Sequence, residues 1–191
     1  MAKGRLEAFS DGVIAILITI MVLELKVPHE TSLAGLRPLL PILSSYALSF
    51  VFLGIYWTNH HHLFQAVERV DGRVLWANLH LLFWLSLISF VTGWMGENNF
   101  ATLPVALYGV DLLFAAIANF LLVRALYPLH GTDSALVTAL GSDFKGRISI
   151  VFYLLAIPLA FANRWIAIAI YVLVAIMWII PDPRIEKTLV E

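Results

Sequence analysis

An apolar segment near the N-terminus, residues 3–26, constrains the fold of this chain more than any other feature. The twelve residues that follow Asp11 carry no charge and one hydroxyl, that of Thr19. At about 1.5 Å rise per residue, a helix over residues 6–25 spans a hydrocarbon core of roughly 30 Å. Asp11 therefore lies below the membrane surface, where a carboxylate costs about 3 kcal/mol on insertion scales. We expect this carboxylate to have a partner and a function.

The composition extends this expectation to the whole chain. A hydrophobic fraction of 61% with only 13% charged residues is typical of a polytopic membrane protein. The net charge of −1 and the lack of a long basic run argue against a nucleic-acid partner. There is no cysteine, which excludes disulfides and thiolate metal sites. The first segment is too long, and its flank too acidic, for a cleaved signal peptide.

Six apolar runs of roughly membrane-spanning length predict an all-α membrane protein, with one domain over residues 1–191. The fifth run is short and contains Pro158, which favours a kink or an early end. The boundary to the sixth lies at Asn163 and Arg164, so a tight hairpin or one bent segment is expected. The six expected helices cover residues 6–25, 39–66, 73–95, 103–127, 147–162 and 164–181.

The distribution of Lys and Arg predicts the orientation. With the N-terminus inside, nine of these residues fall on the cytoplasmic side and three outside, so both termini are expected in the cytoplasm. The inner nine are Lys3, Arg5, Arg69, Arg73, Arg124, Lys145, Arg147, Arg184 and Lys187, and the outer three are Lys26, Arg37 and Arg164. On the longest inner loop, Thr132 or Asp133 is expected to cap a brief interfacial helix that ends at Leu140.

Several polar side chains of the first three helices fall at one depth, roughly 10 Å inside the cytoplasmic surface, so they can meet. They are Ser10, Asp11, Trp57, Asn59, His60, Asn78 and His80. A carboxylate that accepts hydrogen bonds from an imidazole, an indole or Ser10, with Arg5 one to two turns below, would be a satisfied network. This network either clamps the first helix in place or also titrates or moves during gating, because histidine changes charge near physiological pH.

The chemistry of enzymes and metal sites finds little support in the sequence. Successive helical residues point about 100° apart, so His60, His61 and His62 cannot bind one metal ion. The chain has no GxSxG or HExxH motif and no cysteine nucleophile. We therefore expect neither an enzyme nor a bound cofactor.

One face of the first helix has a distinct composition. At about 100° per residue the following side chains share a stripe, with Thr19 at its edge: Arg5, Phe9, Gly12, Ile16, Ile20 and Leu23. Asp11 lies on nearly the opposite side of the helix. The stripe can face a lumen, lipid or another helix, whereas Asp11 has to face protein.

The motif Arg5-x-x-x-Phe9-Ser10-Asp11, which opens this helix, resembles the signature of the transmembrane-protein-175 family of potassium channels. That family is known from lysosomes and endosomes and, as shorter members, from bacteria, and its repeat has six helices. The longer members carry two repeats per chain and pair up. The resemblance therefore implies that this one-repeat chain forms a homotetramer in the lipid of a bacterial cell membrane. It also implies a fold unlike classical P-loop potassium channels, and no TVGYG-like segment is present.

By the same resemblance, the first helix lines a central pore with Ile16, Thr19, Ile20 and Leu23. Rings of branched aliphatic side chains cannot replace the hydration shell of an ion, so a narrow ring acts as a hydrophobic gate. Potassium would pass transiently near Ile16, Thr19 and Ile20, with moderate selectivity. Without the resemblance, packing of these side chains on other helices would be the simpler interpretation.

These observations predict a passive, potassium-permeable cation channel. The alternative is a proton-coupled secondary transporter that uses the intramembrane acids Asp11 and Asp111, although broken helices and repeats typical of that class are not evident. Asp111 is expected either to bond a hydroxyl or amide of a neighbouring helix or to line an outer ion vestibule.

Overall fold

The structure, a computed structural model, describes residues 3–130 and 144–179 of the chain. Within these ranges it contains six α-helices and a short 3-10 helix, η1. Their bounds are α1 Lys3–Leu23, η1 Leu33–Leu39, α2 Leu40–Gln65, α3 Gly72–Glu97, α4 Thr102–His130, α6 Phe144–Ala162 and α7 Arg164–Ile179. Five helices are long and apolar enough to cross a membrane, whereas α7 has 16 residues. The prediction of an all-helical membrane protein with six helices is confirmed.

The helix ends differ from the expected ones where polar residues continue a helix beyond its apolar part. Helices α1 and α6 each include the three residues before their expected starts, and α4 includes the three after its expected end. Helix α6 continues through Pro158. Between α6 and α7 a single residue, Asn163, makes the turn, and its side-chain oxygen accepts a hydrogen bond from the backbone N–H of Trp165 at 3.0 Å. This cap explains the tight hairpin. The interfacial helix expected at 132–140 lies outside the described residues.

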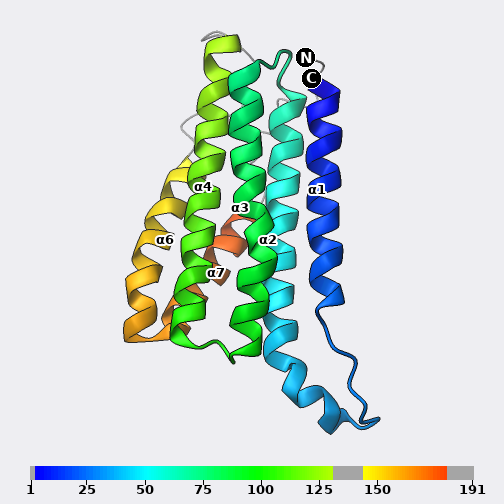
Figure 1. The fold of residues 1–191 in the computed structure, drawn as a ribbon. Coiled ribbons are helices and arrows are strands. Elements are labelled where there is room, and N and C mark those ends of the chain that lie inside the picture. The colour runs from blue at the N-terminus through cyan, green and yellow to red at the C-terminus, as the bar shows by residue number, and fades with distance from the viewer. Residues whose placement is uncertain (1–2, 131–143, 180–191) are drawn as a thin grey trace.

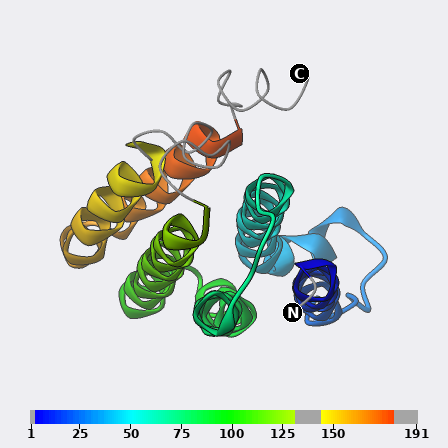
Figure 2. The same cartoon turned by 90° about the horizontal axis from the view of Figure 1, so that it is seen from above.

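Across the subunit the helices follow the order α1, α2, α3, α4, with α6 beyond α4 and α7 behind α3 and α4 (Figure 1). The view from above shows the same order, with α1 at one margin and the α6–α7 hairpin at the other (Figure 2). Helix α1 packs on α2 and α3, while α4 packs on α3, α6 and α7. Each margin of the subunit is therefore a single helix or hairpin with one side uncovered.

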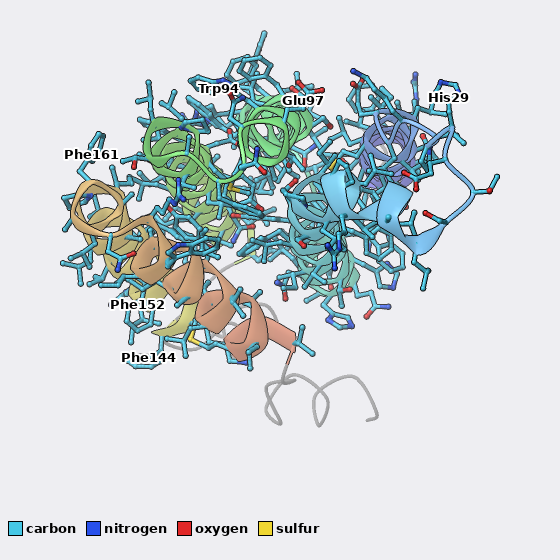
Figure 3. All side chains as sticks on the ribbon, turned by 90° about the horizontal axis from the view of Figure 1, so that it is seen from below. His29, Trp94, Glu97, Phe144, Phe152 and Phe161 are labelled. Carbon is cyan, nitrogen blue, oxygen red and sulfur yellow. The ribbon has the colours of Figure 1, made fainter. Side chains whose placement is uncertain are left out.

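The margin formed by α6 is aromatic and apolar. Phe144 and Phe161 are 66% and 63% exposed, and in the view from below they point away from the bundle (Figure 3). Exposed apolar side chains on a membrane-length helix are suited to contact with lipid tails.

Two glycines let helices approach closely in the half of the bundle near the α3–α4 turn. A Cβ at Gly96 would meet the Ser45 hydroxyl and, at 2.8 Å, the Cα of Ile42, so α2 and α3 touch there. A Cβ at Gly109 would overlap the hydroxyl of Tyr171, so α7 presses a tyrosine against the backbone of α4. Small residues at such crossings are a general feature of helix packing in membranes, where close van der Waals contact drives association.

Candidate pore-lining face and its supporting network

Helix α1 has two faces of different kinds. The buried face, which packs on α2 and α3, consists of Leu6, Ser10, Ile14, Leu17 and Met21. All six members of the predicted stripe lie off this face: Arg5, Phe9, Gly12, Ile16, Ile20 and Leu23 are exposed in the single chain. The exposed fraction is 57% for Ile16, 43% for Ile20 and 81% for Leu23. The α1 stripe, as we call these six residues, is thus an aliphatic surface that the chain itself does not cover.

Thr19 is exposed beside the α1 stripe, and its hydroxyl is already engaged. Thr19 Oγ1 donates a hydrogen bond to the carbonyl oxygen of Ile16 at 2.8 Å. Because the hydrogen is directed back to the helix, the lone pairs of the oxygen are left for other groups. An oxygen held in this way can accept from water or contact a cation, and it is poorly placed to donate.

Asp11 is attached to α2 by an indole. Trp57 Nε1 donates to Asp11 Oδ1 at 3.0 Å, and the Trp57 ring stacks on His61 with 6.1 Å between ring centroids. Asp11 has the partner that its depth requires, although the donor is an indole rather than an imidazole or Ser10. The carboxylate is exposed in the single chain rather than buried. Hydrogen bonds to a charged acceptor are stronger than neutral ones, so this contact holds one flank of α1 against α2.

A second, buried chain of hydrogen bonds ties α1 to α3 and α2. Asn78 Nδ2 donates to Ser10 Oγ at 2.9 Å, and Ser10 Oγ donates to the carbonyl oxygen of Leu6 at 2.9 Å. His60 Nε2 lies 2.9 Å from Asn78 Oδ1. Since the amide nitrogen of Asn78 is used by Ser10, its oxygen accepts and His60 Nε2 carries the hydrogen. At most 2% of Ser10, His60 or Asn78 is exposed, so each polar group depends on the others.

Two residues of the predicted network lie elsewhere. His80 is exposed on α3, where its Nε2 accepts a hydrogen bond from Trp84 Nε1 at 2.9 Å. Asn59 lines a cavity between α2, α4, α6 and α7, on the other side of α2 from α1. Ser10, His60 and Asn78 do meet, as a shared level predicts. Neighbouring residues on a helix point about 100° apart, however, so Asn59 and His60 cannot both face α3. The His80–Trp84 pair has the i, i+4 spacing that could have identified it.

Asp111 does not have the partner expected for it. The residue is 3% exposed, and neither carboxylate oxygen has a hydrogen-bond partner among the described residues. It bonds no neighbouring hydroxyl or amide there, and in the single chain its burial separates it from an outer vestibule. Nearby on the same level of the bundle, Ser49 bonds Thr92 at 2.6 Å and Tyr108 at 3.0 Å, a buried cluster that the sequence analysis missed.

Comparisons with known proteins show which family the chain belongs to. The model of a family described as endosomal/lysosomal potassium channel TMEM175 matches residues 5–88, which hold the Arg5–Asp11 motif, all of α2 and the larger part of α3. A potassium channel of Chryseobacterium sp. (strain P1-3) is 56% identical over 191 residues, which is 100% of each chain. This chain belongs to the TMEM175 family of potassium channels. It is a member of an ion-channel family and not an enzyme.

Further relatives show how much of the TMEM175 architecture this chain contains. The crystal structure of a lysosomal potassium-selective channel TMEM175 homologue from Chamaesiphon minutus matches with a TM-score of 0.79 and 31% identity, over 92% of this chain and 95% of that one. The endosomal/lysosomal proton channel TMEM175 of Danio rerio is 28% identical over 135 residues, 68% of this chain but 25% of the relative. The chain thus has the length of the bacterial, single-repeat members.

Proposed function

We propose that this TMEM175 chain forms a homotetrameric, potassium-permeable channel whose central pore is lined by α1. The bacterial relatives named above are potassium channels, and they match nearly the whole chain. One narrow helix stripe cannot enclose a conduit, so several copies have to surround an axis. A tetramer gives this one-repeat chain the same number of repeats as a pair of two-repeat chains.

The observation that carries the proposal is the position of the α1 stripe. Helix α1 stands at one margin of the subunit, and its opposite side packs on α2 and α3 (Figure 2). The uncovered side presents Ile16, Ile20 and Leu23, spaced by three or four residues along one line. Four such margins brought together would form stacked aliphatic rings around a common axis.

The chemistry of these rings supports a gate rather than a filter of fixed ligands. Isoleucine and leucine side chains offer no oxygen to a cation, so a constriction at Ile16 or Ile20 opposes water and ions when narrow. When it is wide, potassium passes at least partly hydrated. Thr19 supplies the nearest oxygen, and its bond to Ile16 leaves lone pairs for a passing ion. Transient contact near Ile16, Thr19 and Ile20 fits moderate selectivity.

The supporting network determines which side of α1 meets the axis. The Trp57–Asp11 bond and the His60–Asn78–Ser10 chain hold two different flanks of α1. Rotation of α1 about its own axis would break both contacts. The signature motif therefore acts by orienting the α1 stripe, while Arg5 and Phe9 continue that stripe toward the start of the helix.

Insertion with both termini in the cytoplasm of a bacterial cell follows from the Lys and Arg distribution and from the bacterial relatives. Helix α1 runs unbroken from Lys3 to Leu23. A proton-coupled transporter built on Asp11 and Asp111 is less favoured, because such sites usually sit on interrupted helices.

The test is potassium flux into liposomes that contain the purified protein. Flux through a channel follows the potassium gradient and needs no coupled ion, whereas a transporter saturates and requires a proton gradient. Ile20→Asn is expected to raise the flux several-fold or to weaken selectivity against sodium. The matched control is Ile166→Asn on α7, which is 45% exposed against 43% for Ile20 and lies far from α1. Equal behaviour of the two variants would contradict the pore assignment.

Subunit counting tests the assembly independently. Native mass measurement in detergent is expected to give four copies of the chain. A monomer that still carries potassium flux would disprove a pore lined by α1, because one α1 stripe cannot surround an ion path.

A further inference from the structure

A buried carboxylate without a partner lies away from the proposed pore. Asp111 is on α4, and 3% of it is exposed. Both of its oxygens lack a hydrogen-bond partner among the described residues. An ionised carboxylate in a low-dielectric interior is costly unless it is paired or hydrogen-bonded. The cost of burying this charge therefore has to be offset by a group or ion other than the described contacts of the chain.

The surroundings of Asp111 are phenols rather than cations. Asp111 lies close enough to Tyr56 on α2 and Tyr108 on α4 to interact with them electrostatically. Tyr153 on α6 and Tyr171 on α7 complete the cluster, with 6.3 Å between their ring centroids. No Lys, Arg or His has a described contact with this carboxylate.

Two hydroxyls of this cluster are already engaged by other groups. Tyr108 bonds the hydroxyl of Ser49 at 3.0 Å, and Tyr171 donates to the backbone carbonyl of Val105 at 3.1 Å. From α3, Ser89 comes close to the level of Asp111, as the stacking of Trp84 on Phe114 shows for the antiparallel pair. Ser89 Oγ is also buried without a partner among the described residues. At this level of the bundle, α3 and α4 thus each carry a buried polar side chain without a partner among the described residues.

A cavity begins beside this cluster, and its mostly apolar wall carries several polar side chains. It lies between α2, α4, α6 and α7, and its volume for water-sized molecules is about 30 Å³. A site of that volume with several polar walls has room for about two waters. Tyr56 belongs both to the cavity wall and to the neighbourhood of Asp111, so it joins the two. The polar side chains of the wall are Tyr56, Asn59, Asn119, Ser149, Tyr153 and Trp178.

The cavity extends from the middle of the bundle toward the end where α6 begins and α7 ends. Asn119 is two turns further along α4 than Asp111, and Ser149 lies near the start of α6. Ser149 accepts a hydrogen bond from Trp178 at 2.9 Å, which closes the wall between α6 and α7. Water in this space would form a path from Tyr56, beside Asp111, toward the end of the bundle at which α1 starts.

We propose that Asp111 is a proton-binding site inside each subunit, separate from the pore, which exchanges its proton with water held in the cavity between α2, α4, α6 and α7. A proton neutralises the carboxylate and needs no additional volume. Asp111 is not itself part of the cavity wall, so the proton reaches it by way of Tyr56. One carboxylate oxygen gains an O–H bond as the Tyr56 hydroxyl gives up its proton, and that hydroxyl takes a proton from a cavity water, which recovers it from bulk solution. The site is neither the Asp11 network nor the α1 stripe, since α1 packs on α2 and α3 and contributes nothing to the cavity.

The test is infrared spectroscopy of the purified tetramer or other native assembly in lipid at neutral pH. A protonated carboxylic acid gives a carbonyl stretch distinct from that of a carboxylate. We expect this band in the wild-type protein, its loss in Asp111→Asn, and its full retention in Glu24→Gln, which removes an exposed acid. Aspartate labelled with ¹³C at the side-chain carboxyl should shift the band in the wild-type protein, which assigns the band to an aspartate rather than a glutamate.

Exchange into heavy water tests the role of the cavity. The band should shift on transfer to D₂O. Asn119→Leu replaces a polar side chain of the cavity wall by an apolar one of similar size, and it should slow that shift several-fold. A folded wild-type protein without the protonated band would overturn the proposal. So would a carboxylate band that changes when potassium is replaced by a large organic cation, because a metal ion would then be the counter-charge. An exchange rate unchanged by Asn119→Leu would overturn the path through the cavity.

Discussion

The two intramembrane aspartates of this chain have opposite surroundings. Asp11 is exposed on the single subunit and accepts a hydrogen bond from the indole of Trp57 at 3.0 Å. Asp111 is 3% exposed and has no hydrogen-bond partner among the described residues. Both are acids within membrane-length helices. The exposed acid is the one with a hydrogen-bond partner, and the buried acid is the one without.

The comparison teaches that the acid at the subunit margin is the one with a structural task. Asp11 forms a hydrogen bond that joins α1 to α2, and in the proposed channel this bond orients α1. Within residues 3–130 and 144–179 Asp111 joins no two helices through a hydrogen bond, whereas close packing at Gly109 brings α4 and α7 together. Removing the Asp11–Trp57 bond and disturbing the packing at Gly109 should therefore change the stability of the protein by different amounts.

The largest effect is expected at the packing contact beside Asp111. In Gly109→Ala the new Cβ would overlap the Tyr171 hydroxyl, so Tyr171 has to move and lose its bond to Val105. We expect a loss of about 3 kcal/mol in the free energy of unfolding, at the upper end for overpacked cores. Titration with a denaturing detergent, followed by tryptophan fluorescence, measures it. Gly93→Ala is the control, since a Cβ at Gly93 meets nothing within 4 Å. Equal losses would show that the close approach of α4 and α7 is unimportant.

The next effect concerns the buried chain that holds α1. Asn78→Leu keeps the size of the side chain but leaves the N–H of His60 buried without an acceptor. A loss of about 2 kcal/mol is expected, because an unsatisfied buried donor costs about 1–3 kcal/mol. Asn98→Leu serves as control, because Asn98 is exposed at the end of α3 and bonds only the nearby Trp94 carbonyl in the described structure. The same detergent titration applies, and comparable losses would mean that the buried chain contributes little.

Much of the region around Asp11 could be predicted from the sequence because depth follows from counting. The rise per residue places Ser10, His60 and Asn78 at one level, and the structure joins them. The α1 stripe could also be predicted, since a face of one helix depends only on the angle between residues. The six helices themselves follow from apolar runs of membrane length.

The rotation of each helix against its neighbours could not be predicted in this way. Helices of nearly uniform hydrophobicity carry no polar face that would indicate which side is inward. For this reason Asn59 was assigned to the network, although it faces the cavity, and His80 was too, although it bonds Trp84. The missing partner of Asp111 depends on the packing of α4 against α6 and α7, which no local pattern encodes.

Substitution of each aspartate by leucine compares the two acids directly. Asp11→Leu should lower the free energy of unfolding by about 1 kcal/mol, because the Trp57 indole loses its acceptor. Asp111→Leu should leave stability unchanged or raise it by about 1 kcal/mol, since an unpaired buried polar group is replaced by an apolar one. The two expected changes in the free energy of unfolding differ in sign, so the comparison does not depend on their exact magnitudes. Destabilisation by both substitutions would show that Asp111 has a structural partner in the membrane.

The smallest effect is expected at the exposed pair on α3. Trp84→Phe removes the indole donor to His80 but keeps an aromatic ring to stack on Phe114, 4.5 Å away between centroids. Because His80 is exposed, water or another polar group can replace the lost donor, and a change below about 0.5 kcal/mol is expected. The melting temperature should be measured on both the assembled protein and the dissociated subunit. A substantially larger loss in the assembly alone would mean that a neighbouring subunit covers this face of α3. The surface through which subunits meet would then extend from α1 onto α3.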